Sequence, residues 1–251
     1  MSPRRRDPAT RAELIEISAR LLAEEGSEAM SSRRIAKEAG TSTMAVYTHF
    51  GSMSGLVREM VHEGFGRLAA AFDRITWSDD PVRDLAVIGR VYRRTAVSNA
   101  HLYSVMFGDR AIAGFELSEE DRQYGRFNLL PVVECAARCV EAGRFRGEDA
   151  MLVAHHMWLA MHGGVTLELN GYLIDPCDAD RCFESQTVTL MVGAGDTLEA
   201  AQASVLASAE AFARDFGDGV GEGASAAEPE AAGDGLDGGG GRRERTPSKS
   251  G

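Results

Sequence analysis

The residues best suited to chemistry lie in one stretch, Ser31 to Phe50, which reads SSRRIAKEAGTSTMAVYTHF. Its second half carries hydroxyl, thioether and aromatic groups at Thr43, Met44, Tyr47 and Thr48. Groups of this kind, shown on one side of a helix, can hydrogen-bond to base edges and touch thymine methyl groups. The spacing therefore suits a segment that reads DNA.

Two short helices must position these groups. Ser31 or Ser32 can accept a hydrogen bond from a free amide at the start of the first helix. Gly40 fits the end of that helix, because glycine adopts the left-handed backbone at low cost.

The second helix is predicted from Thr43 to about Phe50, with Thr41 and Ser42 as possible caps. Val46 and Phe50 are four residues apart and point the same way, so they can hold the helix from behind. Its amino-terminal end is then free to enter a major groove. The alternative is a surface helical hairpin of no special function.

A longer ordered set of residues surrounds this hairpin. It comprises Leu21-Leu22-Ala23-Glu24-Glu25-Gly26, Ile35-Ala36, Ala39-Gly40, Tyr47, His49-Phe50 and Leu56. With these residues the segment from Thr10 to Leu56 resembles the DNA-binding domain of the TetR/AcrR family of transcriptional regulators.

The resemblance implies a role for each matching residue. Tyr47 and His49 would hold phosphates, and Arg33 would reach the backbone or a base edge. The residues implied to approach the groove are Thr41, Ser42, Thr43 and Met44, and Thr48 on the same face is a further DNA-binding candidate. This chain has Met53 where family members usually have lysine, which puts a phosphate contact there in doubt.

The first helix carries Leu14, Ile17 and Leu21 at helical spacing. Two starts fit the sequence. Asp7 can cap a helix that begins at Pro8, or Thr10 and Glu13 can form a capping box.

The charge balance looks unfavourable for a DNA-binding protein, with 27 Lys and Arg against 38 Asp and Glu and a net charge of -11. The first sixty residues, however, hold nine Lys and Arg and eight Asp and Glu, so the acidity belongs to the rest of the chain. Arg4-Arg5-Arg6 precede the first helix, either as an arm on DNA or as a solvated tail.

The amino-acid composition limits the other kinds of protein that this chain can be. An apolar content of 44% in 251 residues suffices for one large or two modest domains. Charged residues, glycine or histidine interrupt each apolar stretch, so we expect no membrane-spanning helix. We therefore expect a cytoplasmic location. Cys135 and Cys139, one turn apart, are expected to be buried thiols, with a metal site or redox switch as the alternative.

Helical periodicity continues beyond the hairpin, and no segment alternates as a strand would. Helices are predicted from Leu56 to about Trp77, from Pro81 to about Ser98, and over residues 101–114, 118–143, 148–173 and 196–216. The fold class is therefore all-α, with a helix-turn-helix domain joined by a long helix to a helical bundle.

Two passages, Leu102 to Gly108 and Trp158 to Gly163, resemble a C-terminal domain of TetR/AcrR regulators named for its Trp, His and Gly residues. That resemblance implies a small apolar or amphipathic effector bound between helices. Candidate lining residues are Tyr103, Met106, Phe107, Trp158, Met161 and His162. His155 and His162 lie seven apart, but no carboxylate or thiol at a matching spacing supports a metal site.

The same resemblance implies a homodimer through the two final long helices, expected at 148–173 and 196–216. The second carries a narrow stripe of small and apolar residues, Leu198, Ala201, Val205, Ala209 and Phe212. The alternative for this stripe is an ordinary core helix within one subunit.

The domain plan expected from these patterns is a basic arm at 1–9, a DNA-binding domain at 10–56, an effector and dimerisation domain at 57–216, and a disordered glycine-rich tail at 217–251. The function expected is a regulator, usually a repressor, that binds a palindromic operator and leaves it when the effector binds.

Two other classes stay open. A helical enzyme or metal-dependent protein would need a nucleophile and base or a ligand cluster, and no such motif is present in the sequence. A helical adaptor would use the hairpin for protein contact. No cofactor is expected.

Overall fold

The computed structural model describes residues 7–107, 118–146 and 149–217. The chain divides into two units, Met1–Gly217 and Asp218–Gly251, and every described residue lies in the first. Arg4-Arg5-Arg6 and the tail predicted beyond Gly217 fall outside the described residues.

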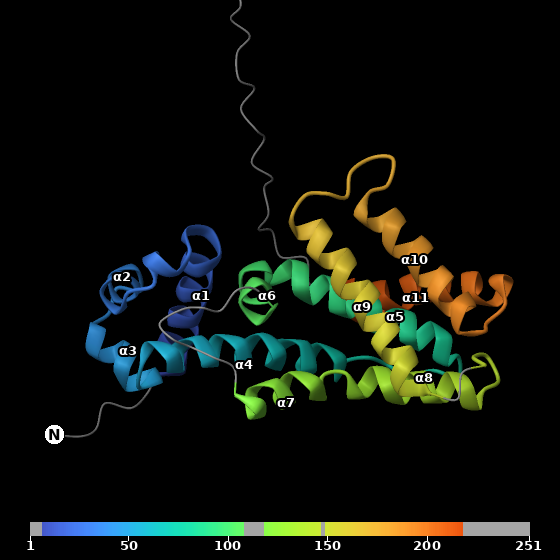
Figure 1. Cartoon of the computed structure of the whole chain (residues 1–251), viewed down its shortest axis with the longest axis horizontal. Coiled ribbons are helices and arrows are strands. Elements are labelled where there is room, and N and C mark those ends of the chain that lie inside the picture. Colours follow the sequence, from blue (N-terminus) through green and yellow to red (C-terminus); the bar gives the residue numbers. More distant parts are fainter. Residues whose placement is uncertain (1–6, 108–117, 147–148, 218–251) are drawn as a thin grey trace, which may run out of the picture. The chain divides into compact units, whose positions relative to one another are not determined.

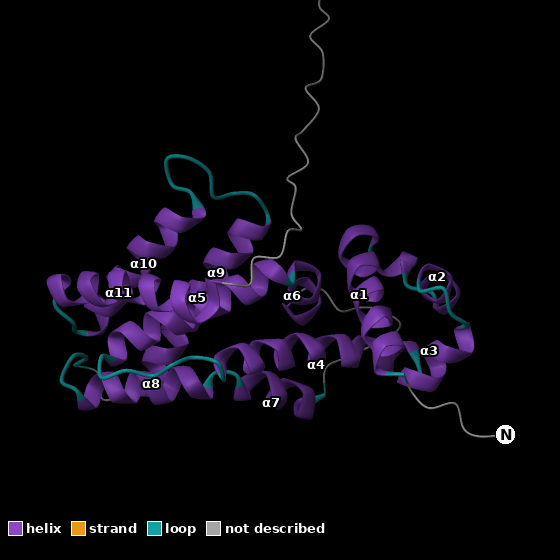
Figure 2. Ribbon diagram, turned by 180° about the vertical axis from the view of Figure 1, so that it is seen from behind, coloured by secondary structure: helices purple, strands orange, loops and turns teal. Residues whose placement is uncertain are grey.

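All regular structure in the described residues is helical, which confirms the all-α prediction (Figure 2). Besides one short 3-10 turn at Ser27–Ala29, the helices in Figure 1 are α1 (Pro8–Glu25), α2 (Ser32–Glu38), α3 (Thr43–Phe50), α4 (Met53–Phe72), α5 (Pro81–Ser98), α6 (Ala100–Phe107), α7 (Glu119–Phe127), α8 (Leu130–Glu141), α9 (Ala150–Leu169), α10 (Ala179–Ala194) and α11 (Leu198–Phe216). None of these helices is long and apolar enough to cross a membrane.

Helices α1 to α3 and the first half of α4 share one apolar cluster, which we call the head core. Leu14, Ile35, Val46 and Leu56 are fully buried in it. Helix α6 also joins this cluster through Leu102, Val105 and Met106, although it lies fifty residues further along the chain. The head core is therefore completed by α6, a helix that lies outside the sequence segment of α1 to α4.

The second cluster, the bundle core, is built around α5. Twelve of the eighteen residues of α5 are buried, and α4, α8, α9 and α11 pack against it. Its N-cap is Asp80, whose side chain accepts hydrogen bonds from the amides of Val82 and Arg83, and Pro81 occupies the first turn. The helix predicted from Pro81 to Ser98 is confirmed.

Helix α4 contributes to both clusters. Met60, Val61 and Phe65 pack in the head core, whereas Leu68 and Phe72 pack in the bundle core. The boundary expected after residue 56 falls inside this continuous helix.

Some helix limits differ from those expected. Helix α1 begins at Pro8 with Asp7 as its cap, which selects one of the two alternatives. The single helix expected at 118–143 is wrong, because Pro131 lies in the first turn of a new helix, α8, where a continued helix would need its missing amide.

Helix α10 was not predicted. Its sequence, ADRCFESQTVTLMVGA, contains threonines and a serine, which are poor helix formers. One of them, Thr187, is buried in the interior, and its hydroxyl donates to the carbonyl of Phe183 at 2.7 Å. The buried side of α10 therefore includes a polar residue and shows no clear helical period of apolar residues, which is why the helix was missed.

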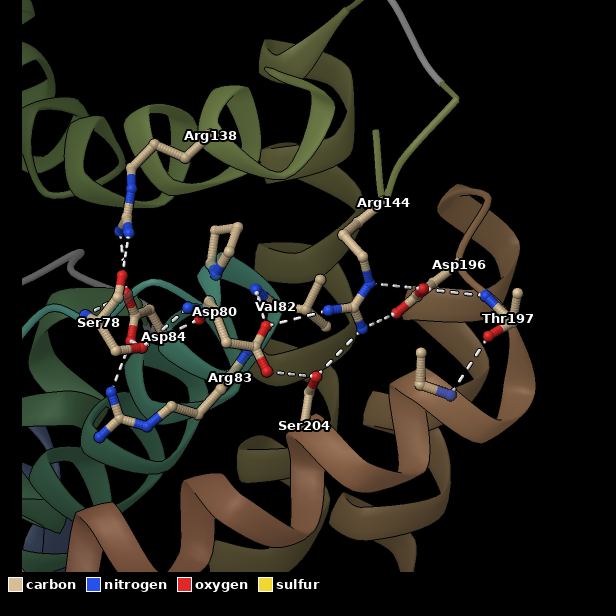
Figure 3. A network of polar contacts seen from close by, with 12 residues as sticks. Ser78, Asp80, Val82, Arg83, Asp84, Arg138, Arg144, Asp196, Thr197 and Ser204 are labelled. Carbon is tan, nitrogen blue, oxygen red and sulfur yellow. Dashed lines mark hydrogen bonds and ion pairs between the residues drawn. The ribbon is translucent and has the colours of Figure 1, made fainter. Parts of the chain in front are cut away.

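A polar network holds the start of α5 against α8, α11 and the turn that precedes α11 (Figure 3). The carboxylate of Asp84 is fully buried and accepts from the Ser78 hydroxyl at 2.7 Å and from the Arg83 and Arg138 guanidiniums at 2.8 and 2.9 Å.

The second half of the network centres on Arg144, which follows α8 (Figure 3). Its guanidinium donates to both carboxylate oxygens of Asp196, at 2.8 and 2.6 Å, and to Asp80 at 3.2 Å. Ser204 on α11 also donates to Asp80, at 2.6 Å. One end of the bundle is thus fixed by paired charges rather than by apolar contacts.

We expect Asp84→Asn to destabilise the protein by about 3 kcal/mol, because it leaves two guanidiniums facing a neutral amide in a buried site. Chemical denaturation at fixed protein concentration measures the change. The matched control is Asp180→Asn, the same change in an ion pair whose carboxylate side chain is 86% exposed, and its cost should be less than about 1 kcal/mol. Equal costs at both positions would contradict the structural role given to Asp84.

Candidate nucleic-acid interface and internal cavity

Helix α3 is held from behind and exposed in front. Val46 is fully buried and Phe50 is 8% exposed, both in the head core with Ile35 and Ala36. The side chain of Ser42 accepts the amide of Ala45 at 3.2 Å, which caps the start of the helix. Gly40 takes a positive φ of 59° in the turn between α2 and α3.

The opposite side of α3 presents the predicted groups to solvent. Thr43 and Thr48 are exposed, and Met44 and Tyr47 are 71% and 45% exposed. The Thr48 hydroxyl donates to the carbonyl of Met44 at 2.8 Å, which leaves its oxygen as an acceptor. Of the other two predicted residues in this region, Ser42 is exposed and Thr41 is half-buried.

The two residues expected to hold phosphates differ in exposure. The Tyr47 hydroxyl lies 3.4 Å from the hydroxyl of Ser32 on α2, so the two groups can contact one phosphate. His49 is half-buried against the Phe50 ring, with 5.9 Å between ring centroids, and its Nδ1 is buried with no partner within the described part of the chain. Sequence reasoning had not selected Ser32, because a serine there served equally well as a cap.

Neighbouring cations on α2 have different surroundings. Arg34 is tied to Glu25 at 2.7 Å and to Glu38 at 3.1 Å. Arg33 and Lys37 are exposed and form no ion pair with any other described residue. They are one turn apart and thus share one side of the helix. Lys37 is a candidate that the sequence left out, since a single lysine carries no pattern.

The turn between α3 and α4 is tightly packed. Met53, which replaces the usual lysine, begins α4 and packs against the head core. A Cβ at Gly55 would lie 2.1 Å from the carbonyl oxygen of Phe50, so only glycine fits there. The position of α3 relative to α4 is therefore sterically fixed.

A cavity of about 480 Å³ lies between the helices of the bundle, a size typical of small-molecule sites. Four of the six predicted effector residues line it: Met106, Phe107, Trp158 and Met161. Lining from α4 and α5, which the sequence did not indicate, includes Phe65, Leu68, Phe72, Leu85 and Ile88. These side chains also follow the ordinary period of core helices, so no sequence signal distinguishes them.

The other two predicted residues lie behind the cavity wall in a hydrogen-bonded group. The Tyr103 hydroxyl lies 2.6 Å from Nδ1 of His162 and 3.0 Å from the hydroxyl of Tyr92, which itself lines the cavity. Burial lowers the pKa of His162 and raises the pKa values of both tyrosines, so all three groups are neutral near pH 7. These three side chains form a hydrogen-bonded, uncharged group behind the cavity wall.

Helix α7 forms a further wall and joins the cavity to α4. Its Asp121 lines the cavity, and its side chain is 3% exposed. One carboxylate oxygen lies 2.9 Å from Nε2 of His62 and 3.2 Å from Nε of Arg58, both on α4. Burial alone would raise the pKa of Asp121, but hydrogen bonds from Ser118 and His62 and the charge of Arg58 lower it.

The stripe expected at the dimer interface is mostly internal. Ala201 is fully buried and Val205 is 2% exposed, both in the bundle core of the same subunit, and Phe212 packs against that core. Ala209 is half-buried and Leu198 is 57% exposed. The interpretation as an outer stripe is therefore wrong for Ala201 and Val205, because α11 turns this side toward α5.

The segments expected to be the two final long helices are α9 and α11, and they are not consecutive. The last two helices of the described chain are α10 and α11, because α10 lies between the segments 148–173 and 196–216.

Comparison with known proteins places both parts of the chain in one family. The model for bacterial regulatory proteins of the tetR family matches residues 14–60, and that for the tetracyclin repressor-like C-terminal domain matches residues 85–190. The second match contains both passages that suggested a C-terminal domain with Trp, His and Gly. Together the two matches cover more than half of the 251 residues.

Individual relatives agree with these matches. An uncharacterized HTH-type transcriptional regulator of Mycobacterium tuberculosis, Rv0681, is 24% identical over 187 residues, which is 73% of this chain and 81% of the relative. The relatives and the families are transcriptional regulators rather than enzymes.

Two solved structures share the fold. A protein with unknown function from Rhodococcus sp. RHA1 has a TM-score of 0.63 at 24% identity and covers 78% of this chain and all of its own. The TetR family regulator PfmR from Thermus thermophilus has a TM-score of 0.58 at 23% identity, over 71% of this chain and 97% of its own. The chain belongs to the TetR family of transcriptional regulators.

Proposed function

We propose that this regulator binds a palindromic operator as a homodimer, acts as a repressor in the cytoplasm, and leaves the operator when a small apolar or amphipathic effector fills the bundle cavity. The observation that carries the proposal is α3 itself. Its polar side, with Thr43, Met44 and Tyr47, is exposed, while Val46 and Phe50 anchor its other side.

The DNA contacts divide into two kinds. Thr43 and Met44 project from the first turn of α3 and would contact base edges, joined by Thr41, Ser42 and Thr48 at its margins. Tyr47, His49 and Arg33 would contact phosphates, and Ser32 and Lys37 would join them, because Ser32 lies beside the Tyr47 hydroxyl and Lys37 is exposed.

A second copy would pack on the outer side of α9. Leu152, Leu159 and Leu167 are 52%, 62% and 46% exposed, and spacings of seven and eight residues keep them on one side of α9. Gly163 lies between them, and a Cβ there would meet nothing within 4 Å, so a partner helix can approach closely.

The outer side of α11 fits an interface less well. It also shows leucine, with Leu206 68% exposed, but Glu199 and Glu210 are exposed on the same helix. Charged residues are depleted at the centres of interfaces, which favours the α9 surface.

Two contacts can carry an effector's influence to α3. Asp121 ties the α7 wall to α4, which begins three residues after α3 ends. Met106 lines the cavity and also belongs to the head core. Because α4 and α6 both pack against α1, a ligand that shifts either helix changes how the two α3 helices of a dimer are spaced.

Release requires the effector to bind the splayed form more tightly than the DNA-fitting form. The ratio of the effector's affinities for the two forms then equals the ratio by which the effector lowers operator affinity.

Selection of genomic fragments by the purified protein tests the proposal. We expect a recovered site with two half-sites about one helical turn of DNA apart. Tyr47→Phe should weaken binding to all recovered sequences about equally, whereas Thr43→Ala and Met44→Ala should change base preference by about 1 to 3 kcal/mol at single positions. A footprint that none of the three substitutions changes would contradict the assignment of α3.

The salt dependence of operator binding tests which of the neighbouring residues Arg33 and Arg34 contacts a phosphate. Arg33→Gln should reduce the slope of log affinity against log salt by about one, because one phosphate contact is lost. The matched control, Arg34→Gln, removes a cation already paired with Glu25 and Glu38 and should leave the slope unchanged. The reverse pattern would place the phosphate contact on the other side of α2.

Light scattering or sedimentation tests the dimer surface. Leu159→Glu should convert the dimer to monomer and abolish binding to the two-fold site, because it buries a charge at the apolar centre. Leu206→Glu, at a comparably exposed leucine of α11, should leave the dimer intact. Dissociation by the α11 change alone would assign the interface to α11.

A further inference from the structure

The cavity is chemically asymmetric, and this asymmetry bears on what it binds. The lining from α4, α5 and α9 is mostly apolar or aromatic, for example Phe72, Ile88 and Met161. The α7 wall contributes Arg122, Gly125 and Arg126. Because positions 122, 125 and 126 share one side of a helix, both arginines follow the cavity-facing side of α7.

Most other polar groups of the lining are satisfied within the protein; the exception is Asn128, whose buried Oδ1 has no hydrogen-bond partner among the described residues. Both oxygens of Asp121 are used by Ser118, His62 and Arg58. The Thr187 hydroxyl donates to the carbonyl of Phe183, and Nδ1 of His155 lies 2.7 Å from the carbonyl of Met151. None of these groups adds an uncompensated charge.

The two arginines keep unused donors. Their side chains are 52% and 53% exposed and share one carboxylate, Glu119. Arg126 also donates to the side chain of Gln123. Both Nη atoms of Arg122 and Nη1 of Arg126 have no partner among the described residues. Two guanidiniums against one glutamate leave this rim positive, with a fork geometry that matches a carboxylate.

The arginines lie at one end of the cavity. A Cβ at Gly125 would lie 2.8 Å from the Phe65 ring, so this part of α7 is next to Phe65. Phe72, which also lines the cavity, is seven residues further along α4. At 1.5 Å per residue the apolar lining therefore extends about 10 Å along α4 from the arginine end.

We propose that the effector is an amphipathic carboxylate, with its charged head bound by Arg122 and Arg126 and an elongated apolar body lying along α4. Methionine and aromatic side chains around the body accommodate different shapes, so the head group sets the class of ligand. The inference deepens the proposed function and rests on it for the claim that the ligand acts on operator binding.

Calorimetric titration of the full-length protein, below the critical micelle concentration, tests the head group. The probes share one alkyl tail: dodecanoate, dodecan-1-ol and dodecyltrimethylammonium. We expect dodecanoate to bind at least about tenfold more tightly than the alcohol, and the cation to bind most weakly. Equal affinities, tighter binding of the cation, or no binding of dodecanoate would overturn the proposal.

Variants locate the site. The double change Arg122→Gln and Arg126→Gln should lower dodecanoate affinity about tenfold or more and leave the alcohol unaffected. Arg181→Gln on α10, outside the cavity, is the matched control and should change neither. Leu190→Trp, which fills the cavity, should block both ligands, with thermal unfolding as the check that it is folded. Unchanged dodecanoate binding by the double variant would overturn the assignment of the arginines.

Operator binding, measured by fluorescence anisotropy with and without dodecanoate, separates this inference from the proposed function. Arginine-dependent binding that leaves operator affinity unchanged would support the ligand class and contradict release by the cavity. Operator release by the alcohol, with no arginine-dependent binding of the carboxylate, would support release and contradict the ligand class.

Discussion

The structure depends on one helix being buried in two places at once. The first half of α4 packs in the head core and its second half in the bundle core, as Met60 and Leu68 illustrate. One continuous helix thus joins the two cores. At its amino-terminal end, Gly55 lets the backbone of α4 lie directly against the end of α3.

Arginine has two separate uses in this protein. Arg83 and Arg138 pair with the buried Asp84 near the start of α5, and Arg144 pairs with the buried Asp196 just before α11. Arg33 and Lys37 on the head form no ion pair within the described ranges. This division explains how an acidic chain, with a net charge of -11, still presents cations near α3.

Prediction from sequence succeeded where local rules decide the structure. The cap at Ser42, the start of α5 at Pro81 and the period of α4 depend on residues close together in the chain, and all are found as helix ends or buried faces. It failed where the deciding contact was distant. Helix α10 has a buried threonine in place of a clear apolar stripe, and only its packing partners explain why it is a helix.

The sequence by itself determined the helical class, the helix-turn-helix and the exposed polar side of α3, because period, caps and glycine turns are local properties. Tertiary structure alone decided which sides of the later helices face inward. The sequence pattern of an apolar stripe is the same whether the stripe packs against α5 or against a second subunit. In the structure, Ala201 and Val205 are buried in the bundle core. The positive rim at Arg122 and Arg126 likewise exists only because folding brings α7 beside Phe65, more than fifty residues away in the chain.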